Sequence, residues 1–357
     1  MKILQKIDWW IILPSVTIFV LGVTILLSIA PQLFLNQLIF GLFALLIFFL
    51  FSQIDYKIFR QLSNFFYVGS VFFLILTFLL GVATRGSVRW IDFGIVRLQP
   101  SEIIKPLMII FAAAFFSAKK ENLLAFFKHA LMFFIPVFFV LRQPDLGSAI
   151  VFCFFWVGIL LTSGYKPKFA LSFLLFALIL LPFFWHFLKS YQKERIISFL
   201  DPAVDPLGIG YNVIQSMVAV GSGGVLGRGL GRGTQSHLLF LPEYQTDFIF
   251  ASFSEELGLV GGLILLFLYF TLLYRILKIA SVTDSHFGRL IAYGIFFVIF
   301  AQVMINIGMN MGIFPITGIT LPLVSYGGSS LVSLAIMLGM VSSLSRHAKE
   351  DNPLTIR

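Results

Sequence analysis

The chain has 357 residues, of which 59% are hydrophobic and only 11% are charged. A soluble domain has about a quarter of its residues charged, so this composition excludes an ordinary soluble globular protein and indicates that lipid is the solvent. The net charge of +9 does not indicate nucleic-acid binding, because the Lys and Arg residues punctuate apolar runs instead of clustering. Cys153 is the only cysteine, which excludes a disulfide framework and a cysteine-based metal site.

Apolar runs long enough to cross about 30 Å of hydrocarbon recur along the chain. They predict an all-α polytopic membrane protein with about ten transmembrane helices, forming a single domain over residues 1–357. The predicted spans are 9–29, 33–53, 64–83, 102–118, 129–142, 146–164, 168–187, 247–274, 288–311 and 328–345. The fifth span is short and runs into Gln143-Pro144-Asp145, which predicts a broken or tilted helix.

Ten spans place both ends of the chain on the same side of the membrane. If that side is the cytoplasm, fifteen Lys and Arg residues lie inside and nine lie outside, with Lys105 within the fourth span. This bias follows the positive-inside rule and predicts cytoplasmic termini. Three of the outer residues, Arg85, Arg89 and Arg142, lie beside Pro, Gly or Trp and are candidates for binding a lipid phosphate. The alternative for such residues is a side chain that only snorkels to the headgroups.

Residues 188–246, between the seventh and eighth spans, form a connection far longer than two helices need. Its apolar stretches predict a partly helical outer loop with short interfacial or re-entrant pieces packed on the bundle. The run GSGGVLGRGLGRG within it follows no strand and lacks a GK[ST] ending, so a nucleotide-binding loop is not indicated. We interpret its glycines as positions where backbone approaches a ligand or another helix closely.

The segment PEYQTDFIFA, residues 242–251, leads into the eighth span. Thr246 is the predicted N-cap, and Asp247 is expected to open the helix. Asp247 has two alternative roles at this position: a capping carboxylate, or a general base at the membrane–water boundary. Glu255 and Glu256 lie deeper in the same predicted span, where acidic residues are functional candidates.

Two further polar clusters flank the fourth and tenth spans. In the first, Glu102 and Lys105 are three residues apart on one helix face, which favours a buried ion pair over a ligand site. The second cluster, residues 306–330, is rich in Asn, Gly, Pro and Ser. It predicts an outer hairpin folded back into the bundle, although small residues also suit tight helix packing and do not establish a function.

These clusters, in this order, resemble those of the SEDS family, the shape, elongation, division and sporulation proteins. The matching strings are GSVRWIDFG…QPSEIIK, RQPDLGSA, DPLGIGYNVIQSMVAVGSGGVLGRGLGRGTQSHLLFLPEYQTDFIFASFSEELG and NIGMNMGIFPITGITLPLVSYGGSS. Within the family, TQSHLLFLPE and PLVSYGG resemble the elongation branch, RodA, more than the division branch, FtsW.

The resemblance implies a peptidoglycan glycosyltransferase that polymerises lipid II outside the bacterial cytoplasmic membrane for cell elongation and shape. It also implies that Asp247 is the catalytic residue. The candidate substrate-binding residues come from the same clusters and are Arg89, Trp90, Gln99, Glu102, Lys105, Arg142, Asp145, Arg195, Gln215, Ser216, Gln235, Glu243, Thr246 and Ser325.

The expected reaction is an inverting glycosyl transfer in which Asp247 deprotonates the acceptor hydroxyl and a polyprenyl diphosphate leaves. Arg89, Arg142 and Arg195 are the basic residues expected nearest to that diphosphate. A divalent cation, Mg²⁺ or Mn²⁺, could share this charge, although the sequence presents no definite ligand set for a cofactor.

The partners implied are lipid II, the growing glycan strand, membrane lipid and a class B penicillin-binding protein that acts as transpeptidase; no nucleic acid is expected. Two alternatives are a flippase for lipid-linked precursor and a non-enzymatic scaffold of a wall-synthesis complex. The polar clusters gather at one membrane face and not at the midplane, which favours the enzyme over the flippase.

Overall fold

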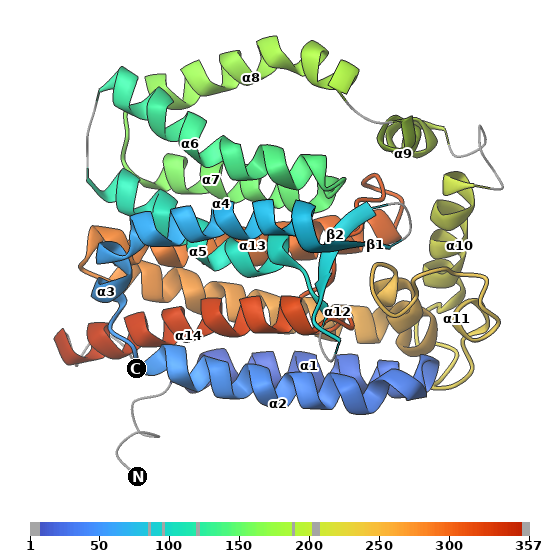
Figure 1. Ribbon diagram of the computed structural model, residues 1–357. Helices are drawn as coiled ribbons and strands as arrows, with labels where there is room; N and C mark the ends of the chain where they lie inside the picture. Colours follow the sequence, from blue (N-terminus) through green and yellow to red (C-terminus); the bar gives the residue numbers. More distant parts are fainter. Residues whose placement is uncertain are drawn as a thin grey trace.

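The computed structural model describes residues 8–84, 87–94, 97–118, 122–187, 190–201 and 208–351. Long helices lie side by side and form a bundle (Figure 1). Those that correspond to the predicted spans are α1 Trp9–Ile29, α2 Pro31–Gln53, α4 Ser63–Leu80, α5 Pro100–Ser117, α6 Leu123–Arg142, α7 Leu146–Thr162, α8 Pro167–Phe187, α12 Ile249–Val282, α13 His286–Asn310 and α14 Gly328–Asp351. Eight of the described helices are long and apolar enough to cross a membrane, and α7, with 17 residues, is a shorter apolar helix.

Short elements gather mainly at one end of the bundle (Figure 1). The chain between α8 and α12 contains α9 Ser190–Leu200, α10 Ile209–Ser222 and α11 Thr234–His237, and α10 runs across the ends of the long helices. The prediction of helical pieces in this long connection is therefore confirmed. An antiparallel sheet of β1 Gly81–Thr84, β2 Ser87–Asp92 and β3 Arg97–Leu98, which the sequence analysis did not predict, follows α4. The remaining short helix, α3 Tyr56–Gln61, lies at the other end.

Helix α6 is longer than the predicted fifth span. It runs without interruption over 20 residues, and its first turn is capped by Asn122, whose side chain accepts a hydrogen bond from the Leu124 amide. The predictions of a short span and of a broken helix are wrong, because the apolar residues before Lys128 belong to the same continuous helix.

Helix α12 also departs from the prediction of one continuous span from residue 247. It begins at Ile249, and Gly258 interrupts it with φ 66° and ψ −165°, a conformation outside the helical region. Residues 259–282 alone reach about 36 Å at about 1.5 Å per residue, enough to cross the hydrocarbon. Residues 249–257 are thus a separate half-helix at the end of the bundle where the polar clusters meet.

The opposite end of the bundle is tied together by a buried ion pair. Two guanidinium nitrogens of Arg275 on α12 donate to the carboxylate of Asp8, at 2.6–3.1 Å, and the Ser345 hydroxyl on α14 donates to the same carboxylate at 2.5 Å. Asp8 also caps α1. Three helices are therefore held by one carboxylate.

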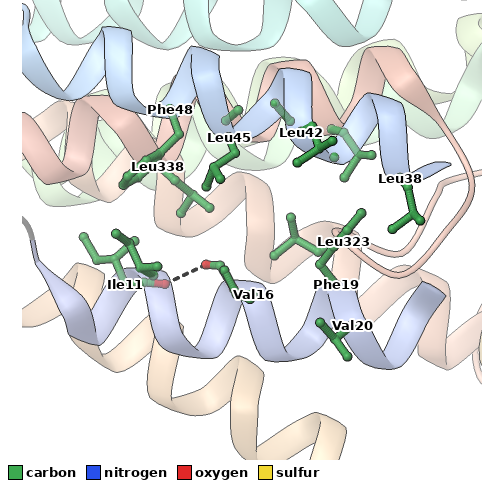
Figure 2. Close-up of a pocket in the computed structure, with 16 residues that line it drawn as sticks. Ile11, Val16, Phe19, Val20, Leu38, Leu42, Leu45, Phe48, Leu323 and Leu338 are labelled. Carbon is green, nitrogen blue, oxygen red and sulfur yellow. Dashed lines mark hydrogen bonds between the residues drawn. The ribbon is translucent and has the colours of Figure 1, made fainter. Parts of the chain in front are cut away.

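An apolar groove of about 290 Å³ lies between α1, α2 and α14 (Figure 2). The hydroxyl of Ser15, which lines it, donates to the Ile11 carbonyl at 2.7 Å, so the helix itself satisfies this donor. The other lining side chains are apolar. The groove therefore presents no charged group for chemistry, and the charged and polar side chains gather elsewhere, at the ends of the helices.

Candidate active site

Asp247 lies half-buried in the turn before α12, and its backbone is fixed by two side chains of α13. The Asp247 carbonyl accepts hydrogen bonds from the amide nitrogens of Asn306 at 2.9 Å and Asn310 at 3.1 Å. Both asparagines are fully buried. Asn310 Oδ1 in turn accepts from the backbone amide of Ala251 at 3.1 Å. The last turns of α13 therefore hold both the Asp247 backbone and the first turn of α12.

The segment between α13 and α14, residues 311–327, folds back against the same turn. The hydroxyl of Ser325 donates to the Thr246 carbonyl at 2.6 Å, and the amide of Tyr326 donates to the Gln245 carbonyl at 3.0 Å. These contacts confirm the prediction that the segment folds back into the bundle. They also place two predicted substrate-binding residues, Thr246 and Ser325, directly beside Asp247.

Thr246 is not the N-cap that the sequence analysis predicts. The residue before α12 is Phe248, and no side chain caps the helix there. Glu243 has a positive φ of 51°, and its carbonyl accepts from the amides of Thr246 and Phe248, which closes a separate turn. The Thr246 hydroxyl donates to Glu243 Oε2 at 3.1 Å and so is directed back into this turn.

Gly318 marks the point where the Asp247 carboxylate and the Arg195 guanidinium converge. It adopts φ +75°, and a Cβ at this position would lie 3.4 Å from Asp247 Oδ2 and 3.9 Å from Arg195 Nη1. Arg195 Nη1 also donates to the Ile316 carbonyl at 3.3 Å. A carboxylate and a cation from α9 thus face the same small space on the returning segment.

A second carboxylate, Asp145, lies in the turn between α6 and α7. It is buried and accepts hydrogen bonds from the Ser101 hydroxyl at 2.8 Å, the Gln99 amide at 3.1 Å and the Ser148 backbone at 3.0 Å. Burial opposes its ionisation, but the charge of Arg89 and the hydrogen bonds from Ser148 and Ser101 outweigh that effect and lower the pKa of Asp145 below its ordinary value. Asp145 is therefore ionised.

Arg89, on β2, holds that same turn. Its Nε donates to the Gln143 carbonyl at 3.1 Å and its Nη2 donates to the Pro144 carbonyl. Pro144 has the unusual φ of 27°, so the guanidinium supports a strained turn. These contacts place Arg89 beside Asp145.

Residues 317–319 contact both carboxylate clusters. A Cβ at Gly147, just after Asp145, would lie 2.6 Å from the Ile319 side chain and 2.8 Å from the Thr317 carbonyl. Gly318, between those two residues, faces Asp247. The returning segment is therefore the element that joins the two clusters.

Glu102 and Lys105 form the buried ion pair that their spacing predicts. Lys105 Nζ lies 2.6 Å from Glu102 Oε1, and both side chains are almost fully buried in α5. The Ser333 hydroxyl on α14 donates to the Glu102 carbonyl at 2.8 Å. Within the part of the chain that the structure describes, Glu102 Oε2 has no hydrogen-bond partner.

Two of the predicted substrate-binding residues lie in other surroundings. Arg142 is exposed at the end of α6, where its guanidinium lies 5.8 Å from the centre of the Phe138 ring. Trp90 is half-buried in β2, paired with Val82 of β1. Arg85, the remaining basic residue singled out from the sequence, lies outside the described residues.

The three predicted residues in the connection between α9 and α12 differ in their contacts. Ser216, fully buried on α10, donates to the Asn310 carbonyl at 2.9 Å and so packs behind the Asp247 turn. Gln215 is half-buried on the same helix. Gln235 contacts Glu255, whose carboxylate accepts its backbone amide at 3.1 Å.

The glycine-rich run after α10 closes the break in α12. The backbone carbonyls of two residues before Gly258 accept hydrogen bonds from amides of the glycine-rich run. The first two backbone amides after Gly258 donate to carbonyls of the same run. The pairs are Arg228–Glu255, Gly229–Glu256, Leu259–Gly224 and Val260–Val225, at 2.9–3.1 Å. Backbone groups that the break would leave without partners are satisfied in this way. The interpretation of these glycines as sites of close backbone approach is confirmed.

The carboxylates of Glu255 and Glu256 accept hydrogen bonds from backbone amides of the glycine-rich run and of the residue that follows it. Glu255 Oε1 accepts from the Thr234 backbone amide at 2.7 Å. Glu256 Oε1 accepts from the Ser28 hydroxyl of α1 at 2.7 Å and from the Gly231 amide at 3.2 Å. These contacts give the two acids a structural role in anchoring the loop. Among the described residues, no group of three His, Cys, Asp or Glu side chains could hold a metal ion.

The comparison with known proteins decides the family. The FtsW, RodA and SpoVE family of cell cycle proteins matches residues 5–350. This chain belongs to that family. The resemblance that the polar clusters indicate is thereby confirmed, and the helical, polytopic fold agrees with it.

Three relatives give the family its context. The chain is 41% identical over 305 residues to the peptidoglycan glycosyltransferase MrdB of Escherichia coli K12, covering 84% of this chain and 81% of MrdB. A chain of a peptidoglycan synthase complex that coordinates polymerization and crosslinking matches with TM-score 0.82 and 30% identity, over 97% of this chain and 99% of that one. The rod shape determining protein RodA of Thermus thermophilus matches with TM-score 0.70 and 28% identity, over 95% and 97%.

The sequence did not indicate some of the residues that lie around Asp247 in the structure. Asn306 and Asn310 stood out only as part of a polar cluster, and Gly318 only as part of a Pro- and Gly-rich hairpin. Two amides four residues apart inside an otherwise apolar helix do carry a signal, since buried amides in a membrane need partners. Which carbonyl they bind could not be read from the sequence.

Proposed function

We propose that this chain is a peptidoglycan glycosyltransferase that polymerises lipid II into glycan strands for cell elongation and shape. It acts as a single domain in the bacterial cytoplasmic membrane, with both termini cytoplasmic and the Asp247 site at the outer face. The observation that carries the proposal is the Asp247 carboxylate beside Arg195, on a backbone held by Asn306 and Asn310. The names of its relatives support the same reaction.

In this reaction Asp247 is the general base. It accepts the proton of the 4-hydroxyl of the acceptor GlcNAc as that oxygen bonds to the anomeric carbon of the donor MurNAc. The bond from this carbon to the diphosphate breaks at the same time, with inversion. A diphosphate leaves as an anion without the strong general acid that an alcohol needs, so one carboxylate suffices.

The departing diphosphate gains negative charge, which fixed cations stabilise. Arg195 is the first candidate, because its guanidinium and the Asp247 carboxylate face the same space at Gly318. Arg89 and Arg142, which contact the turn or the helix end before Asp145 and not Gly318, remain candidates for binding the same diphosphate. The other proposed substrate-binding residues are Trp90, Gln99, Glu102, Lys105, Asp145, Gln215, Ser216, Gln235, Glu243, Thr246 and Ser325. A divalent cation, Mg²⁺ or Mn²⁺, could share the charge on the diphosphate.

The proposed partner is a class B penicillin-binding protein that crosslinks the strands. The structural neighbour from a synthase complex in which polymerization and crosslinking are coordinated supports this choice. The alternatives are a flippase and a scaffold. An interrupted helix is a feature of transporters, and α12 is interrupted. However, no second interrupted span appears among the described helices, and the polar clusters lie at one end.

Purified protein in liposomes with lipid II and its partner transpeptidase distinguishes the three functions. Glycan strands on a gel support the glycosyltransferase. Translocation of labelled lipid II without strand formation supports the flippase. If neither strands nor translocation are observed, the scaffold is supported. The partner is present in every reaction because the synthase can be silent alone.

A further inference from the structure

The glycine-rich run that closes the break in α12 carries large apolar side chains on its surface. Leu226 is 80% exposed and Leu230 is 50% exposed. The other exposed apolar residues of the same stretch are Val225, Leu238, Leu239 and Phe240. A cluster of exposed apolar residues of this size on one loop indicates a surface that is covered in the working protein.

Two of these residues continue the lipid-facing surface of α12. The Val225 carbonyl accepts from the Val260 amide at 3.1 Å, and Gly258 packs against the Val225 and Leu226 backbone. Leu259 and Val260, at the start of the long half of α12, are exposed, as is Leu263 one turn further. Because apolar side chains on this face meet hydrocarbon, Val225 and Leu226 extend the same face beyond the end of the helix.

The other side of the run continues the surface of α1. The Gly231 amide donates to the Ser28 hydroxyl near the end of α1 at 2.9 Å. Leu230 therefore lies next to the end of α1, whose neighbouring Leu27 is also exposed. The loop bridges the ends of two spanning helices at the end of the bundle where α10 lies (Figure 1).

The arginines of the loop lie where basic side chains are expected to meet lipid headgroups. Arg228 donates to the Thr234 hydroxyl at 2.9 Å and lies 4.0 Å from the Glu255 carboxylate, so its charge is partly balanced within the loop. Arg232, two residues from Leu230, is exposed. An exposed arginine beside exposed leucines at a helix end matches the boundary between hydrocarbon and phosphate.

We propose that Val225, Leu226 and Leu230 insert into the phospholipid leaflet around the ends of α1 and α12, with Arg232 at its phosphates. The occupant of this surface is lipid, because the loop is continuous with two lipid-facing helices and carries a cation at its polar edge. The loop is bonded to the half-helix that follows Asp247, so the leaflet sets the height of this half-helix. If the proposed function holds, this fixes the carboxylate at the level of the substrate diphosphate.

A nitroxide at single cysteines in a Cys153→Ala background measures this insertion without using activity. The protein is reconstituted in nanodiscs of phosphatidylethanolamine and phosphatidylglycerol, and collisions with oxygen and with a water-soluble nickel chelate are compared. Leu263→Cys on α12 is the hydrocarbon control, and Arg232→Cys is the headgroup position. Val225→Cys repeats the measurement if Leu226→Cys does not fold.

The expected depth order is Leu263, then Leu226, then Arg232, with an oxygen-to-nickel accessibility ratio at Leu226 several-fold above that at Arg232. Equal accessibility of Leu226 and Arg232 to nickel overturns the proposal. Protection of Leu226 only after a partner protein is added also overturns it, in favour of a protein contact. Glycan synthesis does not enter either readout, so a failure here is distinct from a failure of the proposed function.

Discussion

Replacing Gly258 by Ala should destabilise the protein strongly, because the break in α12 depends on a conformation that glycine alone adopts readily. The residue has φ 66° and ψ −165°, and holding another residue there costs about 1–3 kcal/mol. A Cβ would also lie 2.6 Å from the Val225 carbonyl oxygen and 2.8 Å from the Leu226 carbonyl carbon. Displacing the glycine-rich run breaks its backbone hydrogen bonds to α12, and each contributes about 1 kcal/mol to stability. The expected loss is about 3–5 kcal/mol.

The assay is thermal or denaturant unfolding in the same detergent, with Gly262→Ala as the matched control. Gly262 lies one turn further along α12 in helical conformation, and its nearest neighbour to an added Cβ is 4.0 Å away. Alanine should therefore be tolerated there and gain up to about 1 kcal/mol from helix propensity. Equal stability of the two variants would refute the role assigned to the break.

Three further changes test other parts of the structure. Asn306→Ala should leave the Asp247 backbone with one amide donor and lower kcat about tenfold or more with little change in KM, measured as glycan synthesis. Arg275→Ala should strand the buried Asp8 carboxylate and cost about 3–5 kcal/mol in unfolding experiments. The ionised Asp145 should stabilise the fold fully above the pKa of 3.8 that it has in the unfolded chain. This stabilisation should be lost as the pH falls through the lower pKa of Asp145 in the folded protein. The measurement is the free energy of unfolding of the wild type and of Asp145→Asn between pH 3 and 7.

Each of these expectations has a result that contradicts it. A rise in KM alone for Asn306→Ala points to substrate contact, not to positioning of Asp247. An Arg275→Ala protein as stable as the wild type shows that the Asp8 pair is dispensable. A stability difference for Asp145→Asn that grows as the pH falls has the wrong sign for a carboxylate with a lowered pKa.

The spanning helices could be predicted from the sequence because lipid imposes a simple rule on them. A run of about twenty apolar residues must satisfy its backbone internally, so nearly every such run is a helix. The break at Gly258 could not be predicted this way, since its partners come from the glycine-rich run some thirty residues earlier. The sheet at residues 81–98 was missed for a similar reason, because its pairing is set by contacts between strands of only two to six residues.

For the candidate site, the sequence indicates residues more readily than it indicates their contacts. The motif around Asp247 singled out this carboxylate as the catalytic candidate, and the spacing of Glu102 and Lys105 predicted the ion pair that they form. Thr246 as N-cap followed from local preference, but the turn at Glu243 redirects its hydroxyl. Local patterns do not contain the tertiary contacts that Asn306 makes, so its amide could not be assigned to the Asp247 carbonyl in advance.

Removal of the acceptor proton by the Asp247 carboxylate is the proposed step that a single substitution tests most directly. Asp247→Asn keeps the size and the backbone contacts of the side chain but removes the base, so it should bind lipid II like the wild type and form no glycan strands with the partner present. Asp92→Asn is the matched control and should polymerise normally, because the Asp92 carboxylate is only half-buried and is bonded to Arg97 in the sheet. Glycan synthesis by purified Asp247→Asn protein at the wild-type rate would contradict the mechanism directly.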